Sequence, residues 1–322
     1  MGAGNHAQGV AYHGSRLGIP TTIVMPVNTP FVKVRQTEEH GATVVMHGER
    51  FDDTAEYALQ LAEERNLTLV HPFNDEDVIA GQGTLGIEML EACPDLDVIL
   101  VPVGGGGLIS GIAIAAKHIN PDIEVIGVQA ERFPSLHRAI NNNEYIAQGS
   151  TLAEKTGAIC KELVDDILLV TEDELEKALC MLLTIEKTVP EGAGAAPLAA
   201  VNTYPERFKG KKVGMVLSGG NIDPRLLASL LMRGLVREGR ITRLRIVLMD
   251  VPGALAQISR IIGDLGGNII DVSHHRLFTE LPAKETYSNV TLETRDSENL
   301  QDILNGLRAA GFTVHVNRAS DL

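Results

Sequence analysis

Short apolar segments alternate with segments of helical period over the first three-quarters of the chain. Several apolar segments have no polar interruption, which is typical of parallel strands covered on both faces. This alternation predicts an α/β fold, an open and mostly parallel sheet covered by helices. Strands are expected at Thr21–Met25, Thr43–Met46, Thr68–Val70, Val98–Val103, Glu124–Gln129, Ile167–Val170 and Lys212–Leu217. Helices are expected at Asp53–Glu64, Gly83–Ala92, Leu108–His118, Glu172–Lys187 and Pro224–Glu238.

The pattern changes at Gly239. Alternating polar and apolar residues in Arg243–Met249 predict a half-buried strand, and Pro252-Gly253 opens a helix that runs to Leu265. The expected order is βαββαβ, the ferredoxin-like arrangement. We therefore expect two domains, residues 1–239 and 240–322. The remaining elements of the second domain are strands at Asn268–Phe278 and Tyr287–Glu293, a helix at Ser297–Ala310 and a strand at Thr313–Val316.

Charge and cysteine content exclude several classes of function. The net charge is −14, and residues 1–240 account for −12 of it. An acidic surface argues against nucleic-acid and anionic-membrane partners, because both require basic surface. The three cysteines form no C-x-x-C pair. Together with an N-terminus that shows no signal peptide, they predict reduced thiols in the cytoplasm and no metal cluster.

The stretch Val98–Ala116 contains no charged residue and is long enough to suggest a membrane span. Pro102 and the four glycines Gly104–Gly107 interrupt it. A buried strand, a loop and a buried helix therefore explain this stretch better than a membrane span.

The tetraglycine loop Gly104–Gly107 stands between the expected strand Val98–Val103 and the helix from Leu108. Glycines let the backbone approach a ligand, and the N–H groups at a helix N-terminus attract anions. The loop therefore favours a phosphate site over an ordinary tight turn, which needs fewer glycines. An acidic protein can hold phosphate in this way with few lysines.

Two other glycine-rich segments are weaker signals on their own. Ser218-Gly219-Gly220-Asn221 directly follows a strand, where ligands bind in parallel sheets, although an ordinary turn explains it equally well. The segment Gly2–Ala7 matches G-x-G-x-x-A, but a dinucleotide site requires a strand before this motif, and none can precede Gly2 here, which argues against nucleotide binding. The histidines show no metal-ligand spacing, so no metal ligand is assigned.

These segments together resemble a known family. Gly4–Gly9, Gly104–Gly107, Glu191–Ala195 and Ser218–Asn221 occur in the order and approximate spacing of the pyridoxal-phosphate-dependent serine/threonine dehydratases, which have fold type II. The tail around Asp250–Leu255 and Gly267–Ile269 resembles an ACT regulatory domain. The combination is similar to threonine ammonia-lyases with one ACT unit.

The resemblance implies a role for each loop. Asn5 would contact the ring hydroxyl of pyridoxal phosphate, Gly104–Gly107 (Gly104, Gly105, Gly106 and Gly107) would hold its phosphate, and Ser218 would bond the pyridine nitrogen. Gly4, Asn5 and His6 would receive the substrate carboxylate. The implied reaction converts L-threonine to 2-oxobutanoate and ammonia, with L-serine as a lesser substrate. Isoleucine or valine would bind the ACT domain near Pro252, Gly253 and Asn268, across a subunit interface of a homo-oligomer.

The sequence departs from the family at one decisive position. The family's Schiff-base lysine lies in an S-F-K-x-R-G-A segment well upstream of the glycine-asparagine-histidine loop, and none of the ten lysines here has that context. That lysine is the nucleophile and base of the reaction. We therefore expect no catalytic residue in this chain and a dehydratase truncated at its N-terminus. The segment between Thr151 and Asp166 is also shorter than expected, so no cation site is transferred.

Two other classes of function stay open. A non-catalytic subunit would sense an amino acid through its ACT domain without releasing ammonia. A nucleotide-binding oxidoreductase, resting on Gly2–Ala7, would bind NAD tightly.

Overall fold

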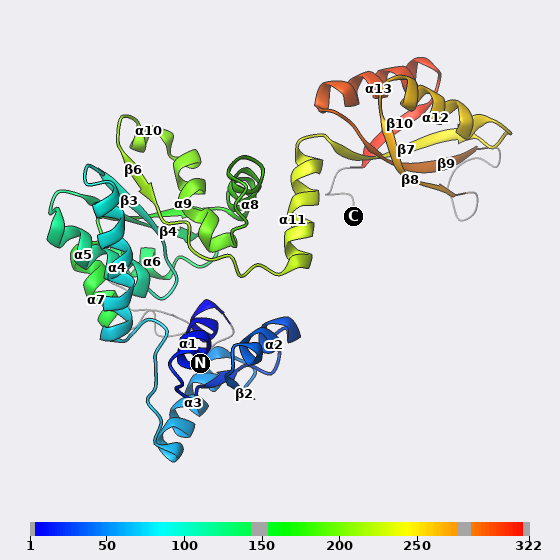
Figure 1. Ribbon diagram of the computed structural model, residues 1–322. Helices are drawn as coiled ribbons and strands as arrows, with labels where there is room; N and C mark the ends of the chain where they lie inside the picture. Colours follow the sequence, from blue (N-terminus) through cyan, green and yellow to red (C-terminus); the bar gives the residue numbers. More distant parts are fainter. Residues whose placement is uncertain (1–3, 143–153, 276–284, 318–322) are drawn as a thin grey trace. The chain divides into compact units, whose positions relative to one another are not determined.

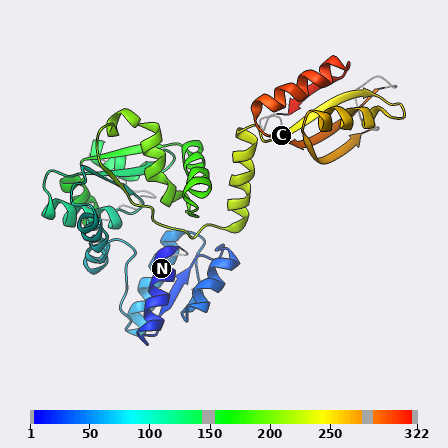
Figure 2. The ribbon, with the colours of Figure 1, turned by 45° about the horizontal axis from the view of Figure 1, so that its top comes forward.

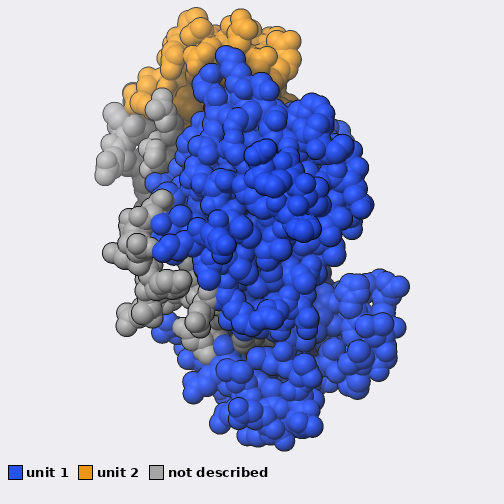
Figure 3. All heavy atoms as spheres, turned by 90° about the vertical axis from the view of Figure 1, so that its left-hand side faces the viewer, with its two compact units in different colours: residues 1–222 blue, residues 223–322 orange. Residues whose placement is uncertain are grey.

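The computed structural model describes residues 4–142, 154–275 and 285–317. The chain forms two compact units, Met1–Ile222 (unit 1) and Asp223–Leu322 (unit 2), which are coloured separately in Figure 3. Each unit has its own buried apolar core. None of the helices in these ranges is long and apolar enough to cross a membrane.

Unit 1 begins with a small parallel sheet of two strands, β1 (Thr22–Met25) and β2 (Thr43–Met46). Successive strand side chains point to opposite faces. Ile23 and Met25 therefore pack with helix α1 (Asn5–Arg16), while Val24 packs with α3 (Phe51–Arg65). Helix α2 (Phe31–Glu39) joins the two strands on the side of α1. This arrangement fixes the start of α1, where Asn5 and His6 lie.

The larger sheet of unit 1 has four parallel strands in the order β5-β4-β3-β6. All five residues of β3 are buried, as the unbroken apolar run predicts. Helices α4, α5 and α7 lie on one side of this sheet, and α8 and α9 lie on the other (Figure 1). The strands are β3 (Val98–Pro102), β4 (Glu124–Ala130), β5 (Asp166–Val170) and β6 (Val213–Met215).

Two helices cross closely beneath the glycine loop. Gly83 in α4 faces Gly111 in α5, and a Cβ atom at Gly111 would collide with the carbonyl of Ile79. The helices of this part are α4 (Glu76–Ala92), α5 (Gly107–Ile119), α6 (Ser135–Asn142), α7 (Glu154–Leu163), α8 (Glu172–Met181) with the π-turn η1 (Leu182–Glu186), α9 (Gly192–Thr203) and α10 (Pro205–Phe208).

The sequence predicted most of these strands, with one error. Val98–Ala116 is a strand, a loop and a helix, which confirms that interpretation over a membrane span. The predicted strand Thr68–Val70 is wrong, because this segment has no secondary structure and pairs with no strand. The Val70 carbonyl instead faces the His6 imidazole. The end of the predicted strand Asn268–Phe278 lies outside the described residues.

Unit 2 opens with helix α11 (Pro224–Arg237) and continues in the predicted βαββαβ order. Its antiparallel sheet has the order β10-β7-β9-β8. Helices α12 and α13 cover one face of the sheet (Figure 2), where apolar residues such as Leu244, Ile246 and Val290 are buried. The elements are β7 (Ile241–Met249), α12 (Ala254–Asp264), β8 (Asn268–His275), β9 (Glu285–Glu293), α13 (Ser297–Ala309) and β10 (Thr313–Asn317).

Candidate functional site

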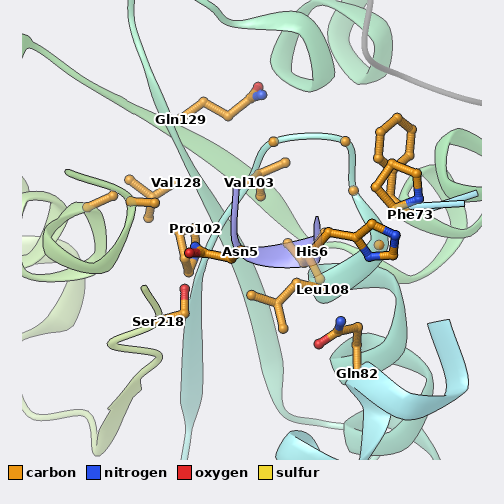
Figure 4. A pocket seen from close by; sticks show the side chains of 18 of the residues that line it. Asn5, His6, Phe73, Gln82, Pro102, Val103, Leu108, Val128, Gln129 and Ser218 are labelled. Atoms are coloured by element: carbon orange, nitrogen blue, oxygen red, sulfur yellow. The ribbon is translucent and has the colours of Figure 1, made fainter. Parts of the chain in front are cut away.

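A cavity of about 1330 Å³ lies in unit 1 at the carboxyl ends of β3 and β4 (Figure 4). Ligands bind at this edge of parallel sheets. The cavity brings together segments that are far apart in the sequence. It is lined by the first turn of α1, the segment around Phe73, the glycine loop, the start of α9 and Ser218.

The glycine loop forms one wall of the cavity and ends as the N-terminus of α5. Gly106 caps this helix with a φ of +87°, a left-handed conformation that favours glycine. Among the described residues, no backbone carbonyl accepts from the N–H groups of Gly104, Gly105 and Gly106. These free donors and the helix dipole make the loop suited to an anion.

Phe73 packs against the glycine loop and fixes its position. A Cβ atom at Gly105 would collide with the Phe73 ring, whereas one at Gly104 would meet nothing within 4 Å. The turn that carries Phe73 is held by His71, whose Nδ1 accepts from the N–H groups of Phe73 (3.3 Å) and Asn74 (2.8 Å). Burial lowers the pKa of His71, which keeps Nδ1 free to accept.

Asn5 and Ser218 both line the cavity, and their side chains lie close to one another (Figure 4). The Nδ2 of Asn5 donates to Oε1 of Glu191 at 2.6 Å. The N–H of Glu191 donates in turn to the carbonyl of Gly219 at 2.8 Å, beside Ser218. Gly219 has a φ of +84°, and a Cβ there would collide with the Glu191 carboxylate. Glu191 therefore joins two of the predicted loops, a role that sequence reasoning missed.

His6 lines the cavity but its imidazole points away from Asn5 (Figure 4). Its Nε2 donates to the carbonyl of Val70 at 3.0 Å. Burial lowers the pKa of His6, so the ring is neutral near pH 7. Gly4 caps α1 in an extended conformation and is not among the residues that line the cavity. The structure thus brings together Asn5, His6, Gly104–Gly107 and Ser218, and leaves Gly4 at the margin.

The lining residues can make the non-covalent contacts that would hold a bound pyridoxal phosphate. The glycine loop offers free N–H groups for the phosphate, and the Ser218 hydroxyl and the Asn5 amide lie on the opposite wall. The described residues that line the cavity include no lysine. They therefore provide the cradle for the cofactor but not the family's covalent attachment.

The predicted effector residues do not meet within one chain. Gly253 caps α12 just after the end of β7, with a φ of +89°. Asn268 begins β8, level with the start of β7, and its Nδ2 donates to Oε2 of Glu293 at 3.4 Å. The eleven residues of α12, about 16 Å of helix, separate Gly253 from the segment that leads into Asn268. The described residues also contain no group of three or more metal-ligating side chains.

Comparison with known proteins identifies the family to which this chain belongs. Residues 1–219 match the family described as "Pyridoxal-phosphate dependent enzyme". The chain is also 42% identical over 325 residues to the L-threonine ammonia-lyase of Thermotoga maritima, covering 98% of this chain and 81% of that protein. The chain belongs to the pyridoxal-phosphate-dependent enzymes. The predicted cofactor and fold type are thereby confirmed.

Two solved structures have a similar fold. Threonine deaminase isoform 2 of Solanum lycopersicum superposes with a TM-score of 0.66 at 35% identity, covering 71% of this chain and 67% of that one. Maize serine racemase superposes with a TM-score of 0.67 at 32% identity, covering 74% and 77%. Residues 242–312 match the ACT domain, which confirms the predicted regulatory domain and leaves α11 between the two matched regions.

Proposed function

We propose that this enzyme acts in the deamination of L-threonine, with L-serine as a lesser substrate, under control of a branched-chain amino acid bound by its ACT domain. The observation that carries the proposal is the shared cavity, which Asn5 and Ser218 line together with Gly104–Gly107, and no backbone carbonyl among the described residues accepts from the N–H groups of Gly104, Gly105 and Gly106. The names of its relatives, an L-threonine ammonia-lyase and a threonine deaminase, support the choice of substrate.

The predicted site residues have separate roles in holding the cofactor and the substrate. The N–H groups of Gly104–Gly107 hold the phosphate, the Ser218 hydroxyl bonds the pyridine nitrogen, and the Asn5 amide bonds the ring hydroxyl. The start of α1, from Gly4 to His6, offers N–H groups to the substrate carboxylate. When bound, pyridoxal phosphate serves as an electron sink for the substrate Cα. A neutral serine at the pyridine nitrogen suits elimination of a β-hydroxyl better than transamination.

The reaction requires a base that the described lining residues do not provide. Elimination removes the Cα proton and the β-hydroxyl of threonine as water, and hydrolysis then returns one water and releases ammonia, leaving 2-oxobutanoate. In the family a lysine amine moves the Cα proton. Here no described lining residue is a lysine. The neutral His6 ring already donates a hydrogen bond from its Nε2 to the carbonyl of Val70. Deamination therefore depends on an amine from outside this set of residues.

Two measurements on the purified chain test this proposal. Calorimetry is expected to show that pyridoxal phosphate binds at least about tenfold more tightly than pyridoxal, because only the former fills the glycine loop. Release of 2-oxobutanoate from threonine is then measured with and without methylamine, which supplies a primary amine. Equal affinity for the two ligands would contradict the cofactor site.

The second measurement separates catalysis from sensing. Release of 2-oxobutanoate that appears only with methylamine supports a deaminase that lacks its amine. Tight cofactor binding without any release favours the alternative of a non-catalytic, amino-acid-sensing subunit, which the absence of a lysine from the described lining also supports.

We further propose that the enzyme is a cytoplasmic homo-oligomer. None of the three cysteines, all of which are described, forms a disulfide, as expected in a reducing compartment. The separation of Gly253 from Asn268 within one chain supports an effector site shared between two copies.

A further inference from the structure

Thr156 lies directly behind the glycine loop. It belongs to the first turn of α7, its side chain is fully buried, and it is not among the residues that line the cavity. Its Oγ1 donates to the carbonyl of Gly105 at 2.9 Å. A Cβ atom at Gly106 would lie only 3.1 Å from the Cβ of Thr156, so the threonine is in close contact with the loop.

This hydrogen bond determines where the next N–H group points. In a planar trans peptide the C=O and N–H bonds point in opposite directions. The carbonyl of Gly105 and the N–H of Gly106 share one peptide, and the carbonyl is directed at Thr156, on the side of the loop away from the cavity. The N–H of Gly106 therefore points toward the cavity, and no protein carbonyl among the described residues accepts from it.

The first turn of α7 is itself held in place. The N–H of Lys155 donates to Oδ1 of Asn74 at 3.2 Å, and its Nζ donates to Glu76 at 2.7 Å. One turn further along α7, the Sγ of Cys160 contacts the Oγ of Ser110 in α5 at 3.4 Å, inside the core. Thr156 is thus a fixed group, and its hydroxyl can hold the loop in one orientation.

We propose that Thr156 is a positioning residue that directs the N–H of Gly106 at the phosphate of the bound cofactor. The inference rests on the proposed function, because it assumes that the glycine loop holds a phosphate group. It assigns to α7 a part in cofactor binding although α7 does not line the cavity.

Three variants of the full chain test the inference by calorimetry. Thr156→Val keeps the shape of the side chain but removes the hydroxyl, and it is expected to raise the Kd for pyridoxal phosphate about tenfold. Its Kd for pyridoxal, which lacks the phosphate, is expected to stay unchanged. Thr156→Ser keeps the hydroxyl and is expected to stay within about twofold of the unaltered chain. Thr37→Val is the matched control, since Thr37 is equally buried and donates to Lys33 at 2.9 Å in α2.

The outcomes distinguish this inference from the proposed function. If the unaltered chain binds pyridoxal phosphate and Thr156→Val binds it equally well, the inference is overturned and the cofactor site stands. An unaltered chain that binds neither pyridoxal phosphate nor inorganic phosphate overturns both. If Thr156→Val weakens the binding of pyridoxal and of pyridoxal phosphate by the same factor, Thr156 has a general structural role, and this result also overturns the inference.

A second measurement does not depend on the folding of any variant. In the unaltered chain labelled with 15N-glycine, inorganic phosphate is expected to shift the amide resonance of Gly106. The amide of Gly210, which lies in unit 1 and does not line the cavity, serves as the reference. Saturation with phosphate that leaves the Gly106 resonance in place would refute the proposed direction of its N–H.

Discussion

Two histidines beside the cavity are kept neutral by burial, and their titration links the stability of unit 1 to pH. Burial lowers the pKa of both His6 and His71 from the ordinary value of 6.5. The unfolded chain then binds more protons than the folded chain as the pH falls below about 6.5. The stabilisation is therefore fully present above about pH 6.5 and is lost as the pH falls toward the lowered values.

We expect the urea-unfolding free energy of the full chain to be lower at about pH 5.5 than at about pH 7.5. The variant His71→Asn is expected to lose less stability over the same interval, because an asparagine oxygen can accept the N–H groups of Phe73 and Asn74 without titrating. Circular dichroism measures both transitions. An identical pH-dependent loss in the variant would exclude His71 from the effect.

The pair of Asn5 and Glu191 predicts a coupled effect on cofactor binding. Because Glu191 orients the Asn5 amide at 2.6 Å, either Asn5→Ala or Glu191→Ala is expected to raise the Kd for pyridoxal phosphate about fivefold to tenfold. The double variant is expected to be little worse than either single variant, since both remove one interaction. Calorimetry on the four proteins completes the cycle. Additive losses would show that the two side chains act independently.

At the scale of elements, the crossing of α4 and α5 positions the glycine loop, and its glycines differ in what surrounds them. A methyl group at Gly111 would collide with the Ile79 carbonyl, so Gly111→Ala is expected to destabilise the chain by about 1–3 kcal/mol. Gly81 in α4 has nothing within 4 Å of an added Cβ, so Gly81→Ala is expected to stabilise it by about 0.5–1 kcal/mol. Urea titration measures both. A neutral Gly111→Ala would mean that the helices can move apart.

The elements that sequence patterns predicted best are those set by local chemistry. The apolar run of β3 is buried at every residue, and α8 begins at its predicted residue, Glu172, where Thr171 and Glu174 cap the helix. Helix α4 begins at Glu76, seven residues before its predicted start, because the Asp75 carboxylate accepts from the N–H groups of Asp77 and Val78. That cap is visible in the sequence but precedes the clear helical period.

The parts that the sequence did not predict depend on contacts between distant residues. Thr68–Val70 has a strand-like composition, yet it pairs with no strand in the part of the chain that the structure describes. Asn5 and Glu191 are 186 residues apart, and Thr156 and Gly105 are 51 apart. Glycine content alone located the loops, because glycine is required by backbone conformation. The side chains that support these loops are ordinary residues, and only the fold brings them together.

At the scale of the whole molecule, acidity and phosphate binding are compatible because different groups are responsible for them. Unit 1 contains 16 basic and 30 acidic residues and therefore carries the whole net charge of −14, whereas unit 2 is balanced at 12 of each. The proposed phosphate site relies on N–H groups of the glycine loop and on the dipole of α5. An acidic enzyme can therefore bind an anionic cofactor while its surface repels polyanions.

The ACT domain provides a test of assembly. Gly253 caps the start of α12 and Asn268 follows its end, and the eleven residues of α12 span about 16 Å, so one small amino acid cannot contact both within one chain. In a symmetric dimer, Gly253 of one copy can lie next to Asn268 of the other copy, and the symmetry then gives two equivalent sites. An effector site of this kind predicts that binding of isoleucine or valine depends on association of two copies.

Mixing two defective variants tests this arrangement. We expect Gly253→Val and Asn268→Ala each to lose isoleucine binding, because every site in either homodimer has one altered half. In a mixed dimer one site has both alterations and the other has none. After equal mixing and subunit exchange, about half the dimers are mixed, so about a quarter of the sites should bind isoleucine again. Calorimetry measures this stoichiometry, and a mixture that stays inactive would show that the two residues do not form one site across copies.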